Sequence, residues 1–368
     1  MNYAQPATEQ LSPQDVSRLL TDLWSELLDV DVEPEDDFFE LGGYSLLIVD
    51  LVARARKVGV QMQARDVYEY RTVARIAEAV TGAPITPNSR ISGNEAFAEI
   101  WRAGANPRRP GAAETLVRVR PEGDCEPVFV VHWGVGNVEF LSGLGTRFAE
   151  GRPVYGLESP GVRAQVRPLL SIGEMAEHYL EQITRIQPNG PYHLCGVCQG
   201  GLIALEIARM LREAGHDVPV LAVLNLPDLE PFIDPAWGPG EILDFRLESL
   251  RGEYGIDDPE HDLVKALPAF AELGWYLTMT PTDYLRQQAV WAANTFAQLH
   301  YHPRPYAGPV LMAQLTAWDP AIRRRWDELL PARHVVTVEG TEHTLPVLRS
   351  TEFLDAFNKL LADARARR

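Results

Sequence analysis

Cysteine, positive charge and long apolar runs are all scarce in this chain of 368 residues. Its three cysteines are too few for a disulfide framework, so we expect a cytoplasmic protein with reduced thiols. The first ten residues lack the basic and apolar regions of a signal peptide. No apolar run approaches the roughly 18 residues that a membrane helix needs. Together these absences predict a chain that is neither secreted nor inserted in a membrane.

The shortage of positive charge bears on possible partners. Lysine and arginine total 34 against 51 aspartates and glutamates, which gives a net charge of -17. This excess of negative charge opposes binding to nucleic acid or to an acidic membrane surface. Residues 1–81 alone contain 15 acidic and 7 basic residues, a share of the negative charge larger than their length. We therefore expect no nucleic-acid or membrane partner, and we expect no metal site.

The composition is otherwise that of a globular protein, with 46% apolar and 23% charged residues, and the length predicts two folded units. Within residues 1–81, apolar residues recur at helical spacing after Ser12, from Ser45 and at 72–80. This pattern predicts a small helical domain. Residues 82–113 then hold four prolines and only one apolar cluster, which is typical of a linker.

Residues 114–368 show a different pattern. Short apolar runs alternate with helical stretches, and they lie at 128–131, 154–157, 192–195, 220–224, 310–315 and 335–338. Buried strands that alternate with helices imply a parallel sheet covered on both faces. The long interval at about 229–305 is rich in aromatic residues, and we interpret it as a helical lid over the carboxyl edge of the sheet. A helical extension of the core is the alternative.

A glycine turn precedes a serine in the segment Asp37-Phe38-Phe39-Glu40-Leu41-Gly42-Gly43-Tyr44-Ser45-Leu46. The glycines permit a tight, exposed turn. Ser45 then stands at a helix N-terminus, where free N–H groups and the helix dipole favour a phosphate. A plain N-cap serine would show the same local geometry. The residues alone leave both an attached phosphate group and a helix cap open.

The segment Gly196-Val197-Cys198-Gln199-Gly200-Gly201 follows an apolar run and precedes a helix. Glycines two before and two after the central residue are required by a nucleophile elbow, because the backbones approach closely there. The central residue is Cys198, whose place at a helix N-terminus predicts a lowered thiol pKa and a nucleophilic thiolate. Cys195 lies inside the strand, and we interpret it as a small core residue. A redox pair of the two cysteines and an inert buried thiol are the alternatives.

His343 follows the last apolar run, in a loop that begins at Gly340. It comes late in the chain, as the order nucleophile, acid, histidine demands, and we predict that it is the general base. Three residues at strand ends are candidates to orient its ring: Asn225, Asp228 and Asp319. A cysteine–histidine pair needs an oriented ring more than a second carboxylate, which favours Asn225. All three are also common turn residues.

An oxyanion hole needs two backbone N–H donors. In an elbow fold one comes from the residue after the nucleophile, here Gln199, and the other from the loop after the first core strand. That loop is His132-Trp133-Gly134-Val135-Gly136, and its glycines suit a backbone that approaches the reacting carbonyl. Gly134 is the predicted donor, while an ordinary turn would explain Gly136 equally well.

The N-terminal segment resembles a known domain. The string at 37–46, together with Tyr70-Arg71-Thr72-Val73, resembles the peptidyl carrier domains of nonribosomal peptide synthetases over residues 12–81. The resemblance implies a four-helix carrier domain with a 4'-phosphopantetheine arm on Ser45, attached by a phosphopantetheinyl transferase. The thiol of that arm would hold an acyl or aminoacyl group.

From about Leu116 onward the chain is similar to the type I thioesterase domains that end such synthetases. The matching segments are 127–136, 196–201, 306–310 and 340–345. The similarity implies an α/β-hydrolase domain with a mostly parallel sheet and a helical lid. Two positions depart from the family: its usual nucleophile is serine, here Cys198, and its usual acid is aspartate, here Asn225.

Some relatives with cysteine are acyl or aminoacyl transferases or form strained rings and amides. We therefore expect acyl transfer in nonribosomal peptide biosynthesis, from a phosphopantetheine thioester through an acyl-enzyme on Cys198. His343 would move the proton, and Gln199 and Gly134 would stabilise the oxyanion. A hydrolytic or macrocyclising thioesterase and a non-catalytic carrier-docking module are the alternatives. The sequence contains no adenylation or condensation domain, so other synthetase or carrier domains are expected to supply the acyl thioester substrate.

Overall fold

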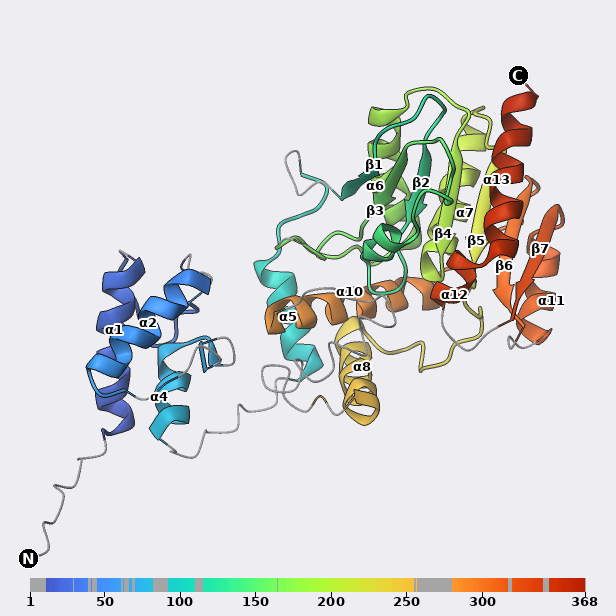
Figure 1. Cartoon of the computed structure of the whole chain (residues 1–368). Coiled ribbons are helices and arrows are strands. Elements are labelled where there is room, and N and C mark those ends of the chain that lie inside the picture. Colours follow the sequence, from blue (N-terminus) through green and yellow to red (C-terminus); the bar gives the residue numbers. More distant parts are fainter. Residues whose placement is uncertain are drawn as a thin grey trace, which may run out of the picture. The chain divides into compact units, whose positions relative to one another are not determined.

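The computed structural model describes residues 11–367 apart from 29, 39–40, 42–44, 61, 63–65, 68–69, 82–91, 110–114, 164, 255, 257–279, 317–319 and 340–343. The chain divides into two compact units, residues 1–90 and residues 91–368 (Figure 1).

Three helices build the described part of the first unit: α1 (Pro13–Leu28), α2 (Ser45–Lys57) and α4 (Val73–Thr81). α1 begins as its sequence predicts, because the Ser12 hydroxyl accepts a hydrogen bond from the N–H of Asp15 at 3.2 Å. Trp24 is fully buried and meets the ring of Phe38 edge-on, with the ring centroids 4.9 Å apart. The expected small helical domain is confirmed, and residues 66, 67 and 70, between α2 and α4, are also helical.

The second unit contains a seven-stranded sheet in the order β1-β3-β2-β4-β5-β6-β7. The strands are β1 (Leu116–Arg120), β2 (Val128–Val131), β3 (Val154–Leu157), β4 (His193–Val197), β5 (Val220–Leu224), β6 (Val310–Leu315) and β7 (Arg333–Val338). Only β1 runs antiparallel to its neighbour. The expected mostly parallel sheet is confirmed, and its central strands are buried along their whole length.

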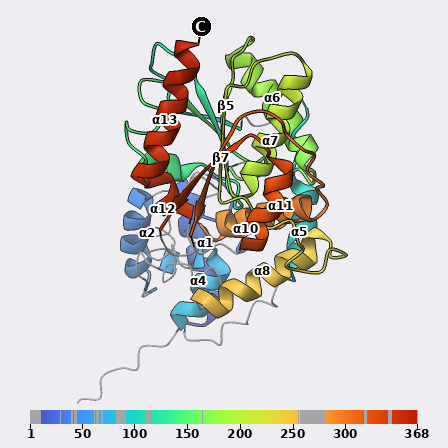
Figure 2. The ribbon, with the colours of Figure 1, turned by 90° about the vertical axis from the view of Figure 1, so that its right-hand side faces the viewer.

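Helices cover both faces of this sheet, as Figure 2 shows. The apolar cluster on one face includes residues of α6 (Ile172–Ile186), α7 (Gln199–Glu213) and α11 (Pro320–Leu329). The cluster on the other face includes residues of the short helix η1 (Glu139–Gly143), α12 (Thr344–Arg349) and α13 (Thr351–Ala366). Because side chains alternate along a strand, each central strand supplies residues to both clusters.

The chain between β5 and β6 contains two long described helices, α8 (Pro239–Tyr254) and α10 (Pro281–Leu299). These helices pack against α5 (Gly93–Ala103), and the three meet in one apolar cluster (Figure 1). Within that cluster Phe97 of α5 lies with Ile242 of α8 and Ala293 of α10. The described part of the interval 229–305 therefore contains two long helices, and α10 contacts α6 and α7 of the sheet unit.

The linker expected over 82–113 is wrong for much of that range. Ser92 caps α5 by a reciprocal pair of hydrogen bonds with Glu95, and the N–H of Gly93 donates to the carboxylate of Asp244 at 2.5 Å. After the helix, Ala105 pairs with the backbone of residues 165 and 167. The apolar residues around Phe97 belong to a packed helix. They recur at helical spacing and contact apolar residues of α8 and α10.

Among the described residues, no helix has both the length and the hydropathy that a bilayer crossing requires.

Candidate active site

β4 turns sharply into α7 at Cys198. This residue has a φ of 54° and a ψ of -123°, a conformation that costs a non-glycine residue free energy. A Cβ on Gly196 would lie 2.4 Å from the carbonyl oxygen of Gly200, and one on Gly200 would lie 1.8 Å from that of His132. Only glycine fits at these two positions. The backbone geometry expected of a nucleophile elbow is therefore present at Cys198.

The thiol of Cys198 is half-buried at the N-terminus of α7. Burial raises its pKa above the ordinary value, while the hydrogen bond from the Gln199 N–H acts in the lowering direction. Among the described groups the pKa of this thiol is raised and not lowered as expected, because desolvation outweighs the Gln199 hydrogen bond. A thiolate at Cys198 therefore requires a base that accepts its proton.

Cys195 lies in the middle of β4 and is fully buried in an apolar cluster. Burial raises the pKa of its thiol well above the ordinary value. Both cysteines are free thiols. This setting fits a small core residue and disfavours a redox pair, which needs a thiolate that solvent can reach.

Gly134 and Gln199 lie next to each other at the carboxyl edge of the sheet. A Cβ on Gly134 would be 3.0 Å from Oε1 of Gln199 and 3.3 Å from Cδ1 of Trp291 on α10. Gln199 directly follows Cys198, so the loop after β2 meets the elbow where the two predicted oxyanion donors must converge.

His132 was not among the predicted site residues, yet it controls the orientation of one predicted donor. Its Nδ1 lies 2.7 Å from the carbonyl oxygen of Trp133, and its Nε2 lies 2.9 Å from the hydroxyl of Tyr179. Burial lowers its pKa to about 4, so the ring is neutral and Nδ1–H donates to Trp133. In a trans peptide, the Trp133 carbonyl and the Gly134 N–H point in opposite directions. Fixing the carbonyl therefore fixes the Gly134 N–H.

Asn225 directly follows β5 and lies beside the elbow, because the N–H of Cys198 donates to the carbonyl of Leu224 at 2.8 Å. Asn225 has a φ of 46° and is 2% exposed. Its Oδ1 accepts a hydrogen bond from the N–H of Leu315 in β6 at 3.2 Å. An amide oxygen can accept a second hydrogen bond, so a role in orienting a histidine ring stays a prediction.

Asp228 is bound elsewhere. Its carboxylate accepts hydrogen bonds from Arg325 at 2.6 Å and from the N–H of Glu230 at 3.1 Å. This pairing at the surface disfavours a catalytic role. The other predicted members, His343 and Asp319, lie outside the described residues.

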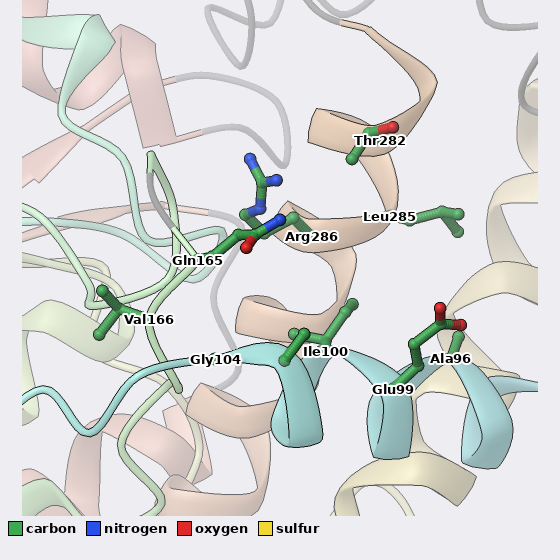
Figure 3. Close-up of a pocket in the computed structure, with 10 residues that line it drawn as sticks. Ala96, Glu99, Ile100, Gly104, Gln165, Val166, Thr282, Leu285 and Arg286 are labelled. Atoms are coloured by element: carbon green, nitrogen blue, oxygen red, sulfur yellow. The ribbon is translucent and has the colours of Figure 1, made fainter. Parts of the chain in front are cut away.

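A cavity of about 250 Å³ lies between α5, α10 and the loop at 165–166 (Figure 3). Its lining includes Ile100 from α5 and Leu285 and Arg286 from α10. Leu285 also packs against the apolar cluster that Cys198 and Trp291 join. The segment expected to be a linker thus forms a wall of a cavity in the second unit.

In the first unit, Ser45 is the first residue of α2, and the first turn of this helix has no acidic side chain. Free N–H groups at such a helix start fit a phosphate on the serine. The chain entering this motif is held by Arg71, whose guanidinium pairs with both carboxylate oxygens of Asp37 at 2.5 and 3.0 Å. Arg71 belongs to the second matching string of the sequence, but this pairing was not predicted, since opposite charges 34 residues apart carry no local pattern.

The elbow at the end of a central parallel strand defines the second unit as an α/β-hydrolase. Residues 18–80 match the phosphopantetheine attachment site family, and residues 126–228 match the thioesterase domain family. The chain therefore carries a phosphopantetheine-bearing carrier domain followed by a thioesterase domain. The predicted resemblance is confirmed for both domains, whereas cysteine as the nucleophile stays a prediction.

Similar proteins include synthetases of much greater length. Malpinin synthetase from Mortierella alpina is 31% identical over 214 residues, 58% of this chain and 2% of that protein. A dimodular nonribosomal peptide synthase from Bacillus subtilis (strain 168) is 32% identical over 216 residues, 58% of this chain and 8% of that protein. The chain thus spans less than a tenth of the length of either relative.

One solved structure has a similar fold over nearly the whole chain. It is a four-domain nonribosomal peptide synthetase in its holo form, bound to AMP and glycine. It has a TM-score of 0.53 and 23% identity, and the match covers 99% of this chain and 27% of that one.

Proposed function

We propose that this protein transfers an acyl or aminoacyl group from a phosphopantetheine thioester to a second nucleophile, through an acyl-enzyme on Cys198, in nonribosomal peptide biosynthesis. The observation that supports it best is the elbow at Cys198, where the backbone adopts a φ of 54° in a residue other than glycine. Such strain is retained where it places a reactive atom, here a thiol at the carboxyl edge of a parallel sheet.

In the proposed first step, the Cys198 thiolate attacks the carbonyl carbon of the thioester. A bond forms between that carbon and Sγ, and the bond from the carbon to the departing sulfur breaks. The N–H groups of Gln199 and Gly134 stabilise the negative charge on the carbonyl oxygen. His343 accepts the thiol proton and gives it to the departing thiolate. A base is required because burial raises the pKa of the Cys198 thiol, which therefore holds its proton.

In the second step, an amine or a thiol attacks the acyl carbon on Cys198, and Sγ leaves. His343 takes the proton from the incoming nucleophile and returns it to Sγ. The acyl group moves between two thioesters in the first step, so that step is close to balance and the group stays activated for the acceptor. A serine at this position would give an oxygen ester, which reacts less readily with either acceptor.

Ser45 is the proposed attachment site of the 4'-phosphopantetheine arm. The bound arm supplies the thiol that presents the acyl group as a thioester. Incubation with a phosphopantetheinyl transferase and coenzyme A is expected to add the mass of one arm to the chain, and Ser45→Ala is expected to prevent the addition. Ser25→Ala, at another serine of the first unit, is the matched control. An arm that still attaches to the Ser45→Ala protein would overturn this site.

Single-turnover mass spectrometry tests transfer against hydrolysis. The acyl-loaded protein is mixed with candidate amines, with a second loaded or unloaded carrier domain, or with buffer alone. Transfer predicts that an acceptor removes the acyl group from the protein at least about tenfold faster than buffer does. Equal release in all mixtures would favour the hydrolytic or macrocyclising thioesterase, and no release with an unreactive Cys198 would favour the docking module.

A further inference from the structure

α10 presents three buried polar side chains to the elbow and to the loop after β2. Asn294, Thr295 and Gln298 are 1%, 0% and 8% exposed. Burying polar side chains costs free energy unless they form hydrogen bonds, so their partners indicate what this part of α10 holds in place.

Asn294 binds the loop that carries the first predicted oxyanion donor. Its Nδ2 donates to the carbonyl oxygen of Gly134 at 2.9 Å. The preceding peptide is fixed as well, because the Trp133 carbonyl accepts from His132 and from the N–H of Gly136 at 2.9 Å. The two peptides that flank the Cα of Gly134 are thus held from opposite sides, one from within the sheet unit and one from α10.

Thr295 and Gln298 bind the residue that carries the second predicted donor. Nε2 of Gln199 donates to Oγ1 of Thr295 at 3.2 Å and to Oε1 of Gln298 at 2.8 Å. Gln298 in turn donates to the carbonyl of Asp228, in the loop after β5, at 3.3 Å. The side chain of Gln199 is 4% exposed, so these hydrogen bonds are shielded from water.

We propose that Asn294 and Gln298 are positioning residues for the oxyanion hole. Asn294 holds the peptide that follows the Gly134 donor, and Gln298 holds the side chain of Gln199, so that α10 and the hole form one hydrogen-bonded unit. The inference rests on the proposed function, in which Gly134 and Gln199 are the donors. A displacement of α10 from the sheet breaks the bonds to Gly134 and to Gln199 together. Stabilisation of the transition state therefore requires α10 to be packed against the loop after β2 and against Gln199.

The polarity of Asn294 gives the inference a sharp test. Its Oδ1 is buried and has no hydrogen-bond partner among the described residues, so the nitrogen alone connects it to Gly134. Asn294→Leu removes the donor at similar volume. Asn294→Asp places an oxygen against the Gly134 carbonyl and replaces attraction by repulsion.

Two rates at Cys198 separate positioning from general damage to the fold. Acylation by a short acyl thioester develops an oxyanion and needs the hole, whereas alkylation by iodoacetamide needs only the thiolate. We expect Asn294→Leu and Gln298→Leu to slow acylation about tenfold to a hundredfold, and Asn294→Asp to slow it further. Alkylation at every pH is expected to stay within about twofold of wild type.

Gln287→Leu is the matched control, because Gln287 is also buried on α10 and its Oε1 has no hydrogen-bond partner in the described part of the chain. It is expected to leave both rates near those of wild type. If Asn294→Leu slowed acylation and alkylation equally, the inference would be overturned in favour of general packing. The same would follow if Gln287→Leu slowed acylation as much as Asn294→Leu does. A wild-type protein that is alkylated at Cys198 but never acylated would refute the proposed function itself, and this inference with it.

Discussion

The residues that follow the neighbouring strands β4 and β5 both have a positive φ but differ in their side-chain surroundings. Val197 and Leu224, the last residues of the two strands, pair in register, and the next residues, Cys198 and Asn225, have φ values of 54° and 46°. Asn225 is buried, and its side chain is bound to the N–H of Leu315. Cys198 is half-buried, and among the described residues its side chain receives only the N–H of its own helix start.

The difference shows two uses of a positive φ at a residue other than glycine. At Asn225 the side chain offsets the strain by linking β5 to β6, and asparagine tolerates a left-handed φ better than most residues. At Cys198 the described residues form no comparable side-chain bond, and we infer that the strain serves to present the thiol. The comparison predicts that substitutions at Cys198 act on chemistry, whereas substitutions at Asn225 act on both stability and chemistry.

The largest expected effect follows from Cys198→Ala. Removing the thiol is expected to abolish acyl-enzyme formation, a loss of at least about a thousandfold in single-turnover acylation. Cys195→Ala, three residues earlier in β4, is the control. It is expected to keep the reaction and to lose about 1 kcal/mol of unfolding free energy from the core. Comparable loss of acylation in both variants would remove the distinction between the two cysteines.

Cys198→Ser keeps the elbow and changes only the nucleophilic atom. We expect it to fold like wild type but to accumulate an oxygen ester or to hydrolyse it, with transfer to the acceptor reduced about tenfold to a hundredfold. Time-resolved intact-protein mass spectrometry separates these species. A serine variant that transfers as fast as wild type would show that cysteine is not required for transfer.

Asn225→Ala tests the other strand end. It removes the hydrogen bond to Leu315 and places alanine at a φ of 46°, so we expect a loss of about 1–2 kcal/mol of unfolding free energy. If Asn225 also orients His343, turnover falls about tenfold at a temperature where the variant is folded. Asp228→Ala is the matched change in the same loop and is expected to alter turnover less than about twofold. If Asp228→Ala reduced turnover more than Asn225→Ala, Asn225 would have a structural role only.

His132, which follows strand β2, is expected to make the free energy of unfolding depend on pH, a smaller effect than those above. Burial lowers the pKa of His132, after β2, to about 4, below the value of about 6.5 for an unfolded histidine. Between these values mainly the unfolded chain binds the proton, so stability falls as pH decreases through this window, by about 1.5 kcal/mol between pH 6.5 and pH 5. Chemical denaturation at several pH values measures this slope. His132→Leu is expected to flatten it, and an unchanged slope would assign it to other groups.

Much of this architecture could be predicted from the sequence, because its signals are local. The glycines around Cys198 and the alternation of apolar runs with helices follow directly from backbone sterics and burial. The missed features depend on contacts between distant segments. Asn294 meets Gly134 across 160 residues, and α5 was interpreted as linker because prolines and glycines surround its one apolar cluster.

The pKa of Cys198 shows a further limit of prediction from sequence. The helix N-terminus is visible in the sequence, whereas the desolvation that outweighs it depends on the side chains that α10 and the loop after β2 bring to the site. The sequence pattern thus predicted the turn between β4 and α7 at Cys198, but not the burial that raises the pKa of its thiol.

The central claim is that Cys198 receives the acyl group, and one measurement tests it most directly. The arm on Ser45 is loaded with an acyl group, the reaction is quenched at short times with acid, and the proteolytic peptides are mapped by tandem mass spectrometry. The account predicts that the acyl group moves from the peptide of Ser45 to Sγ of Cys198, and that prior alkylation by iodoacetamide blocks the movement. An acyl group that leaves the Ser45 peptide at the same rate after Cys198 has been alkylated would contradict it.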